Sequence, residues 1–443
     1  MARLIPNSIS PRHPLSKTRR LLLFWLRKRP AANPHATGAG GDLAVESARG
    51  KPHASTADSV LTVLFLVAIA LPGGALLFSR TGQETTFEKR TLTPWPTPPI
   101  TSQQLVSFPA QFEAAFADRF AGRQTMIQWH NFARLRWLGI PPATSDPRGT
   151  LASNAARSGA AKVLAGKDQW LFFTGDRVID DYRCTRPFSA DELRHWVQTI
   201  IERRNWLAER GIEYTVVFAP NKHTVYGEFL PSSVTRIGTH SRLDQLTDAL
   251  LTDTPVTFVD LRAALFQAKN ENRLYHRTDT HWNDVGALIG SRAVAAKLVE
   301  RLEGTVALPA GSFNVSLRRT SGGDLAQMLG LAELLPEDRL EPQGLAIALT
   351  HSVPPRQNLA GVECRSYASA PVGNINALIL HDSFGLAMMP FLSAQFHYVD
   401  YLHTYDFRYA QRVIEGLPPA ERPKIVIQQY VERILQVHKP DEH

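Results

Sequence analysis

Two short polar segments carry the residue types of a serine nucleophile and its base. The first is HDSFG at 381–385, which follows the apolar run ALIL at 377–380. A serine that ends a buried strand and opens a helix stands at the sheet edge, where the following backbone N–H groups can face a developing oxyanion. Serine alone is a weak nucleophile and needs a base within hydrogen-bond reach. The segment is also compatible with an ordinary turn in which Asp382 or Ser383 caps a helix.

The second segment, DTHWN at 279–283, supplies the remaining parts of a triad. Asp279 and His281 are two residues apart in a non-helical stretch, so their side chains can face the same way. The carboxylate can then hold the Nδ1–H of the imidazole and leave Nε2 facing the nucleophile. In the alternative interpretation, Asn283 or Asp284 caps the following helix and His281 is a structural surface residue.

A metal site is the other chemistry that Asp279 and His281 suggest. Such a site would need a third and a fourth ligand at suitable spacing, and the sequence offers neither an HxxxH pair here nor a CxxC motif. We therefore expect no metal and no other cofactor. Together the two segments favour a triad of Ser383, His281 and Asp279.

An alternation of apolar runs and helical stretches positions both segments. Apolar runs with β-branched residues predict four strands, at 214–218, 256–259, 377–380 and 424–428. Helices are expected between them, at 190–209, 241–251 and 284–302. Short buried strands separated by helices indicate an α/β fold with a parallel sheet flanked by helices. In such a sheet ligands bind beyond the carboxyl ends of the strands, and we expect both segments to follow strands of that sheet.

The segment 59–78 is predicted to be a transmembrane helix. Its twenty residues carry no charge, and a helix of that length just crosses a hydrocarbon core. Residues 1–57 hold ten Lys and Arg against two Asp and Glu, which equals the whole net charge of +8. This bias predicts a single-pass membrane protein with a cytoplasmic N-terminus and with the chain after Arg80 outside the cytoplasm. A cleaved signal peptide is the alternative, but an n-region of 57 residues is too long for an ordinary one.

These features divide the chain into four parts. Residues 1–58 form a basic tail without periodic patterning, for which disorder is expected, and the predicted span 59–78 follows. Residues 79–159 combine a Pro-rich linker with a helical segment that we expect to pack on the main domain through its spaced apolar residues: Phe112, Phe116, Phe120 and Met126. Residues 160–437 form the catalytic domain.

The composition narrows the class of protein. A content of 44% hydrophobic and 20% charged residues is typical of a globular protein rather than of a polytopic membrane protein. Residues 58–443 carry equal numbers of basic and acidic side chains, so we expect no nucleic-acid partner. The two cysteines, Cys184 and Cys364, either form one disulfide or remain free thiols, and the sequence leaves both possibilities open.

The ordered motifs resemble the alginate O-acetyltransferase family (AlgJ/AlgX-like), whose catalytic domain is SGNH-hydrolase-like. DTHWN followed by a helix, and a strand-DSF segment about a hundred residues further on, carry the resemblance. Other segments agree with it and extend it over about residues 85–435: FEKRTL (87–92), FADRFAGR (116–123), GKDQWLFFTGD (166–176), the stretch 192–231 that contains PNKHTVY, and GGDLAQMLGL (322–331).

The resemblance implies an acetyl-serine mechanism. Ser383 would be acetylated and would pass the acetyl group to a hydroxyl of a bacterial exopolysaccharide such as alginate or cellulose. His281 would act as the general base, and Asp279 would orient it. The candidate substrate-binding residues are Lys222, Tyr226, Trp282 and His381. The first two are either substrate-contacting or structural. His381 stands where the family often has glycine, and it would either crowd the oxyanion side or add a donor.

The resemblance also implies partners and leaves two alternative functions open. The acceptor would be an exopolysaccharide, and a multi-spanning membrane O-acyltransferase would deliver the acetyl donor. The chain ends within fifteen residues of its last predicted strand, so we expect no appended carbohydrate-binding module. An SGNH-type carbohydrate acetylesterase shares the triad chemistry up to the acyl-enzyme, and a non-catalytic polysaccharide assembly subunit would share the fold. The polymer, the acetyl donor and the oligomeric state stay open.

Overall fold

The structure is a computed structural model. It describes residues 56–76, 84–85, 90–91, 93–119, 123–135, 162–309, 311, 313–344, 350–357, 359–369 and 374–440. The chain divides into two compact units, Met1–Val67 and Ala68–His443, and all elements that carry the predicted site belong to the second. The predicted tail lies outside the described residues up to position 55.

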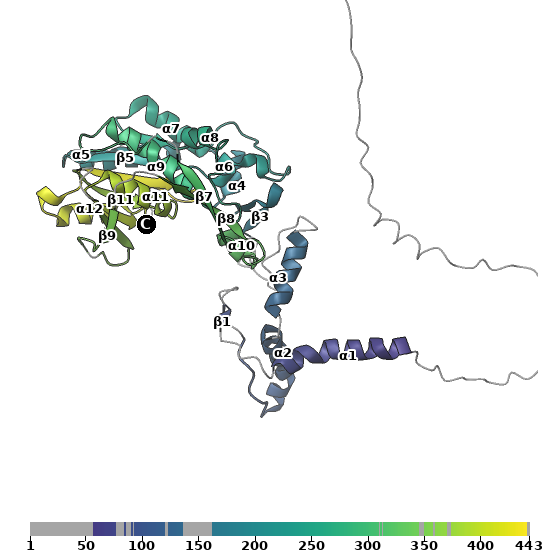
Figure 1. Ribbon diagram of the computed structural model, residues 1–443. Coiled ribbons are helices and arrows are strands. Elements are labelled where there is room, and N and C mark those ends of the chain that lie inside the picture. The colour runs from purple at the N-terminus through teal and green to yellow at the C-terminus, as the bar shows by residue number, and fades with distance from the viewer. Residues whose placement is uncertain are drawn as a thin grey trace, which may run out of the picture. The chain divides into compact units, whose positions relative to one another are not determined.

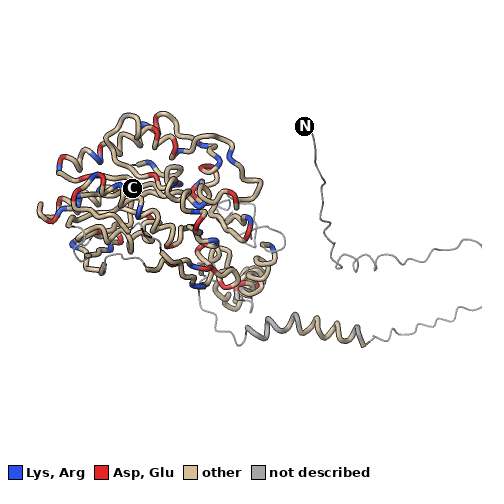
Figure 2. The backbone as a smooth tube through the Cα atoms, turned by 45° about the horizontal axis from the view of Figure 1, so that its top comes forward, with Lys and Arg blue, Asp and Glu red and all other residues tan. Residues whose placement is uncertain are grey.

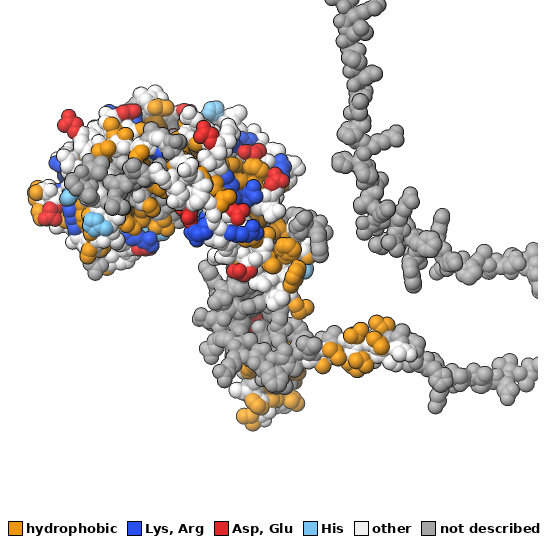
Figure 3. All heavy atoms as spheres, in the orientation of Figure 1, with side chains coloured by type: hydrophobic (Ala, Val, Ile, Leu, Met, Phe, Trp, Pro, Cys, Tyr) orange, Lys and Arg blue, Asp and Glu red, His pale blue; other side chains and the backbone are white. Residues whose placement is uncertain are grey.

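A helix forms over most of the predicted transmembrane segment. Helix α1 spans Thr56–Leu76, and the last two residues of the predicted span lie outside the described part of the chain. Large apolar side chains along α1 are exposed, as the orange atoms in Figure 3 show: Val60, Leu61, Val63, Leu64, Phe65, Leu66 and Val67. Within the described residues, no helix reaches the combination of length and hydropathy required to cross a membrane.

A seven-stranded sheet forms the centre of the second unit (Figure 1). Its order is β6-β5-β13-β11-β12-β10-β9. The strands are β5 (Glu213–Ala219), β6 (Thr257–Asp260), β9 (Thr350–Val353), β10 (Cys364–Ser369), β11 (Asn376–His381), β12 (Tyr398–His403) and β13 (Ile425–Val431). The four predicted strands are confirmed as β5, β6, β11 and β13, and these four lie parallel in one sheet with β12.

The prediction of an entirely parallel sheet is wrong at one edge. Strand β10 runs antiparallel to both β12 and β9. Strands β9 and β10 are only partly buried, and an edge strand that faces water on one side has no continuous apolar run to reveal it. Strand β12 is buried but carries Asp400 in its middle, which interrupts the apolar pattern.

The three predicted helices form with the expected bounds to within a few residues. They are α5 (Ala190–Ala208), α7 (Arg242–Asp253) and α9 (Asp284–Val299). Side-chain caps explain where they begin: Ser189 and Ser241 each form a capping box, and Asn283 Oδ1 accepts the Gly286 N–H at 3.0 Å. Helix α5 contacts α7, and Trp206 packs edge-on against Phe407 of α12 (Phe407–Gly416). Helix α9 contacts α8 (Arg262–Ala268) and α11 (Gly385–Leu392).

Shorter elements surround the site end of the domain. They are β3 (Val163–Ala165), β4 (Leu171–Phe173), α4 (Val178–Arg183), α6 (Lys222–Val225), β7 (Asn314–Thr320), α10 (Asp324–Met328), β8 (Glu337–Gln343) and the 3₁₀ helix η8 (Glu432–Gln436). Strands β3 and β4 pair antiparallel, as do β7 and β8. A small second core of apolar residues links β3 and β4 to α10: Val163, Leu171, Leu325, Ala326, Leu329 and Leu331.

The helical segment before the domain meets it through residues that the sequence did not single out. Helices α2 (Ser102–Arg119) and α3 (Arg123–Ala133) follow the strand pair β1 (Glu84–Thr85) and β2 (Arg90–Thr91). Asn131 Nδ2 donates to the Leu329 carbonyl at 3.0 Å, and Phe132 packs on the small second core. Of the predicted apolar stripe, Phe112 and Met126 are exposed, and Phe120 lies outside the described residues.

The two cysteine thiols of the domain are unpaired, and its positive and negative side chains are mixed. Cys184 and Cys364 are both free, which decides the alternative that the sequence left open. Cys184 Sγ instead accepts a hydrogen bond from Arg236 at 3.1 Å. Basic and acidic positions intermix over the folded domain (Figure 2), in line with the even balance of charges after residue 57.

Candidate active site

The structure brings Ser383, His281 and Asp279 into one hydrogen-bonded line. Ser383 Oγ lies 2.8 Å from His281 Nε2, and His281 Nδ1 lies 2.7 Å from Asp279 Oδ1. The side chains of His281 and Asp279 are 29% and 17% exposed, so the line is open to solvent at the imidazole. The two separations fit the geometry in which a serine, a histidine base and an orienting carboxylate can act together.

The two segments reach this line from different elements. Ser383 follows β11 by two residues, as predicted, and opens α11. DTHWN also follows a strand of the sheet, β6, but helix α8 intervenes between that strand and the loop 276–283. That loop is closed by an isolated bridge between Tyr275 and Trp282. Asn283 caps α9 while His281 faces the serine, so the two interpretations of this segment hold together.

Asp382 stabilises the turn at 381–385 that contains Ser383, called the nucleophile turn below. Its Oδ1 accepts the Phe384 N–H at 2.8 Å, and its Oδ2 accepts the Val431 N–H at 2.6 Å and the Tyr405 hydroxyl at 2.8 Å. The Gly385 N–H donates to the Asp382 carbonyl at 3.1 Å. We expected the N–H groups after the serine to face an oxyanion, but both are consumed by the turn.

The Ser383 N–H is the amide of this turn that could donate to an oxyanion. It has no hydrogen-bond partner among the described residues, and a free amide at the nucleophile is suited to a developing negative charge on the attacked carbonyl. Glycine is required two residues later, since a Cβ on Gly385 would lie 2.5 Å from the Cβ of His381.

Trp282 connects the loop 276–283, called the base loop below, to the nucleophile turn. Its Nε1–H donates to the Phe384 carbonyl at 3.0 Å, and the Phe384 ring centroid lies 5.0 Å from that of His281. The indole is 2% exposed. The serine and the imidazole are thus held at a fixed separation by a contact between their neighbours in the chain.

The carboxylate of Asp279 is held in its ionised form. Burial acts to raise its pKa, but the hydrogen bonds and charge of His281, together with the Asp324 N–H, outweigh burial and lower the pKa below its ordinary value. Oδ1 accepts the His281 N–H at 3.0 Å, and Oδ2 accepts the Asp324 N–H at 3.0 Å. An ionised Asp279 can stabilise the imidazolium that forms when His281 takes a proton.

Lys222 binds the carbonyl side of the base loop. Its Nζ donates to the carbonyls of His276, Arg277 and Asp279 at 3.1, 3.2 and 2.7 Å. Burial lowers the pKa of Lys222 to about 7, although the carboxylates of Asp279, Asp324 and Glu337 favour its charged form. Lys222 is therefore a buried residue that stabilises the base loop.

Glu337 binds the amide side of the same loop. Its Oε2 accepts the Thr278 N–H at 2.8 Å and the Thr278 hydroxyl at 2.7 Å, while Oε1 pairs with Arg273 at 3.0 Å. Burial opposes its ionisation, but the neighbouring His276 side chain, hydrogen bonds from Thr278 and the charge of Arg273 lower its pKa to about 2. The loop is thus held between a cation and an anion that come from distant parts of the chain.

All four candidate substrate-binding side chains are buried. Tyr226 accepts the Leu274 N–H through its hydroxyl at 2.9 Å and packs on Trp170. His381 is 1% exposed, its Nδ1 lies 2.7 Å from the Asp382 carbonyl, and it stacks on His403. Lys222 and Trp282 make the loop contacts described above. Contact of these residues with substrate stays a prediction, and burial argues for a structural role.

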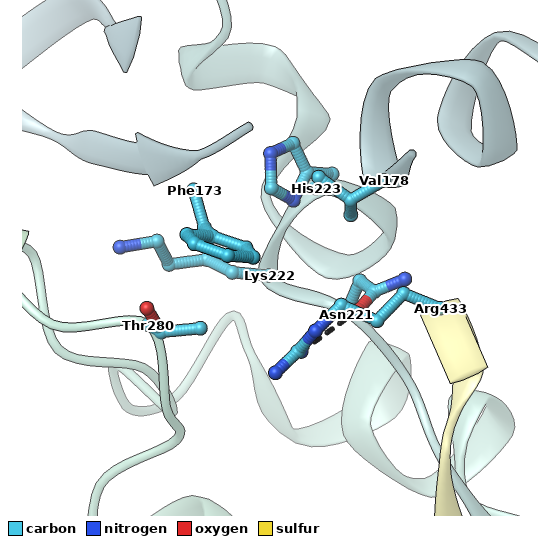
Figure 4. A pocket seen from close by; sticks show the side chains of 7 residues that line it. All are labelled: Phe173, Val178, Asn221, Lys222, His223, Thr280 and Arg433. Carbon is cyan, nitrogen blue, oxygen red and sulfur yellow. Dashed lines mark hydrogen bonds between the residues drawn. The ribbon is translucent and has the colours of Figure 1, made fainter. Parts of the chain in front are cut away.

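A small pocket adjoins the base loop (Figure 4). It is lined by Phe173, Val178, Asn221, Lys222, His223, Thr280 and Arg433. Arg433, from η8 after β13, donates to Asn221 Oδ1 at 3.3 Å and lies 3.4 Å from Asp176 Oδ2. Burial, with Lys222 and Arg433 nearby, lowers the pKa of His223 to about 3, so its ring is neutral. No motif pointed to Arg433, because the fold alone brings it beside the loop.

Asp279, His281 and Asp324 also form the candidate metal-binding group of the described residues. Their ligand atoms lie within 4.8 Å of one another. Each residue already has a protein partner: His281 Nδ1 bonds to Asp279, Asp279 Oδ2 accepts from Asp324, and Asp324 Oδ1 accepts the Thr280 N–H. The chemistry that these contacts fit is that of the hydrogen-bonded triad.

The fold and the site define an SGNH-hydrolase-like α/β domain with a serine at the carboxyl edge of its sheet. Residues 163–361 match the family described as "SGNH hydrolase-like domain, acetyltransferase AlgX". This part of the chain therefore matches the AlgJ/AlgX family of SGNH hydrolase-like acetyltransferase domains, as the motifs predicted. The matched range contains Asp279, His281 and Asp324 and ends before Ser383.

Curated relatives align with part of the chain. "Probable alginate O-acetylase AlgJ" of Pseudomonas aeruginosa is 28% identical over 202 residues, 44% of this chain and 48% of that protein. The protein of the same name from Azotobacter vinelandii is 29% identical over 197 residues, 42% of this chain and 47% of that protein. The chain thus aligns with about half the length of these relatives.

Solved structures show a similar but more distant likeness. The "O-Acetyltransferase Domain of Pseudomonas putida AlgJ" has a TM-score of 0.43 and 20% identity, covering 62% of this chain and 93% of that one. Bacillus cereus PatB1 has a TM-score of 0.45 and 16% identity, covering 63% of this chain and 98% of that one.

Proposed function

We propose that this protein is an O-acetyltransferase that moves an acetyl group through acetyl-Ser383 onto hydroxyls of a bacterial exopolysaccharide such as alginate or cellulose. The observation that carries the proposal is the line from Ser383 Oγ through His281 to Asp279, with separations of 2.8 and 2.7 Å. The names of the curated relatives, which are alginate O-acetylases, favour transfer over hydrolysis.

In the first half-reaction Ser383 Oγ attacks the acetyl carbonyl of the donor while His281 Nε2 takes its proton. The Ser383 N–H donates to the oxyanion, and ionised Asp279 stabilises the imidazolium. His281 then returns the proton to the leaving group, and acetyl-serine remains. In the second half-reaction a sugar hydroxyl attacks the acetyl carbonyl, loses its proton to His281, and Ser383 regains its own.

The decisive experiment follows the acetyl group on the purified protein. It combines an activated acetyl ester with either mannuronate or cellulose oligosaccharides and detects acetylated sugar and acetyl-Ser383 by mass spectrometry. Ser383→Ala should abolish both products. Ser232→Ala, which removes an exposed serine away from the site, is the matched control and should behave as the wild type. Acetate formed as fast with the sugar as without it would show that water is the acceptor and that the protein is an esterase.

The proposal extends to the membrane and to a partner. We propose that the segment 59–78 anchors the protein in the inner membrane with the catalytic domain in the periplasm, where a multi-spanning membrane O-acyltransferase supplies the acetyl group. The basic tail and the uncharged segment after it support this placement. A C-terminal reporter should be active only outside the cytoplasm, and the protein should resist alkaline extraction. Recovery of a shortened soluble form would contradict the anchor.

A further inference from the structure

A second carboxylate stands beside the triad, on the first residue of α10. Asp324 Oδ1 accepts the Thr280 N–H at 2.7 Å, and the Asp324 N–H donates to Asp279 Oδ2 at 3.0 Å. Thr280 lies between Asp279 and His281 in the chain. Asp324 therefore makes two contacts with the triad segment. Its N–H bonds to Oδ2 of Asp279, and its carboxylate bonds to the backbone of Thr280, which joins Asp279 to His281.

The contact depends on a close approach of two backbones. A Cβ on Gly323 would lie 2.3 Å from Asp279 Cβ and 2.5 Å from Asp279 Oδ2, so only glycine fits before Asp324. The Gly323 N–H donates to Thr278 Oγ1 at 3.0 Å, and the Ala326 N–H donates to the Thr278 carbonyl at 3.1 Å. The start of α10 thus packs directly against the base loop and is hydrogen-bonded to it.

The carboxylate of Asp324 also faces the imidazole. Its Oδ2 lies 3.9 Å from His281 Nδ1, on the same ring nitrogen that bonds to Asp279. Burial and then the charge of Asp279 raise the pKa of Asp324 above its ordinary value. The charged groups that face this pair are Asp279 on the loop and Lys222 from α6, while Ser383 and the Phe384 ring close the other side of the imidazole.

We propose that Asp324 is a positioning residue of the reaction. It fixes the orientation of Asp279 and of the Thr280 backbone, and its negative charge adds to that of Asp279 in stabilising the imidazolium formed when Ser383 is acylated. This inference rests on the Ser-His chemistry of the proposed function, but it does not depend on which acyl donor or acceptor the enzyme uses.

The test uses a reaction of Ser383 that needs the triad but no sugar. With phenylmethylsulfonyl fluoride, the Ser383 Oγ–S bond forms, the S–F bond breaks, the proton passes to His281 Nε2 and fluoride leaves. The inactivation rate constant is measured from pH 4 to pH 9 on the full chain. The variants are Asp324→Asn, which keeps an oxygen for the Thr280 N–H but loses the charge, and Asp338→Asn, which removes a half-exposed charge on β8 as a control.

The expected result is a change in both the rate and its pH dependence. Without the charge at 3.9 Å, the imidazolium that forms during the reaction is less stable. For Asp324→Asn, the acid limb of the profile should move down by about 0.5–1 pH unit. The rate on the plateau should fall by roughly 3- to 10-fold because the base is weaker. Asp338→Asn should keep the wild-type profile.

Asp324→Glu separates charge from position. It keeps the charge and displaces the carboxylate, so its acid limb should stay near that of the wild type while its plateau falls. It also serves if Asp324→Asn does not fold. An unshifted acid limb with a plateau within twofold of the wild type in Asp324→Asn, or equal shifts in Asp324→Asn and Asp324→Glu, would overturn the proposal.

Two further outcomes separate this inference from the others. A wild-type protein that reacts with the sulfonyl fluoride through Ser383 but transfers no acetyl group would refute the proposed function and leave the role of Asp324 testable by the same profile. A rate that collapses on addition of a chelator would show that Asp279, His281 and Asp324 hold a metal, and the positioning role would be wrong.

Discussion

The nucleophile turn at 381–385 and the base loop at 276–283 reach the same site by different means. The turn follows a central parallel strand directly, and one side chain, Asp382, bonds it internally and to the end of the neighbouring strand β13. The base loop has no sheet strand before it and is held by Lys222 and Glu337, which come from α6 and β8.

This difference teaches where the site is robust and where it is vulnerable. Backbone pairing of buried strands places the serine, and such hydrogen bonds change little with pH. Ionised side chains place the histidine, and their contribution depends on protonation and on single residues. The base loop should therefore respond more strongly than the turn to pH and to substitutions outside the triad.

The largest effect should come from the triad itself. Ser383→Ala should lower acetyl transfer by at least ~10³-fold, and His281→Ala should come close to it. Asp279→Asn should retain a little activity, because the carboxylate orients and stabilises the imidazolium and does not take the proton. Single-turnover transfer from an activated ester measures all three. Full activity in Ser383→Ala would refute the triad.

Lys222→Met should produce the next largest loss and show the weakness of the base loop. The substitution removes the Lys222 donor from the His276 and Asp279 carbonyls and leaves the Arg277 carbonyl with the Leu171 N–H alone. We expect the free energy of unfolding to fall by about 2–3 kcal/mol and kcat/KM to fall by roughly 10-fold or more as His281 loses alignment. Chemical denaturation and the transfer assay measure the two effects.

Lys167→Met is the matched control for that variant. Lys167 is exposed and donates to a single carbonyl, that of Glu228, so its replacement should change stability by less than about 0.5 kcal/mol. An equal effect of both variants would show that the base loop does not depend on Lys222. A raised KM with unchanged kcat and stability in Lys222→Met would instead return Lys222 to the substrate-binding residues.

The same contrast explains what the sequence could predict. Ser383 and the strand before it were predictable because an apolar run and a polar turn are adjacent in the chain. DTHWN was recognisable as a motif, but its supports were not, since Lys222 is 57 residues from Asp279 and Glu337 is 59 residues from Thr278. Asp324 lay in a segment noted only for its resemblance. The partly exposed strands β9, at the edge of the sheet, and β10, next to it, lacked the apolar runs used to find the others.

Glu337, which binds the base loop, should contribute a smaller and pH-dependent part of the stability. The pKa of Glu337 is lowered to about 2, below the value of about 4.3 for an unfolded chain. The folded protein then binds fewer protons, so this contribution is complete above about pH 4.5 and is lost as the pH falls toward about 2. Glu337→Gln should be less stable by about 1–2 kcal/mol near neutral pH, and the gap should close over that window. A gap independent of pH would contradict the role of the charge.

The smallest effect should come from Tyr226→Phe, which separates a structural from a substrate-contacting tyrosine. The Tyr226 hydroxyl accepts the Leu274 N–H, two residues before the base loop, and Tyr226 is buried with its ring against Trp170. Phenylalanine keeps the ring and leaves one buried amide without an acceptor, at a cost of about 1 kcal/mol. If Tyr226 only supports the loop, the KM for an oligosaccharide acceptor should stay within twofold of the wild type while the melting temperature falls by a few degrees. A KM raised several-fold at unchanged melting temperature would place the hydroxyl in contact with the sugar and would require the loop to open around it.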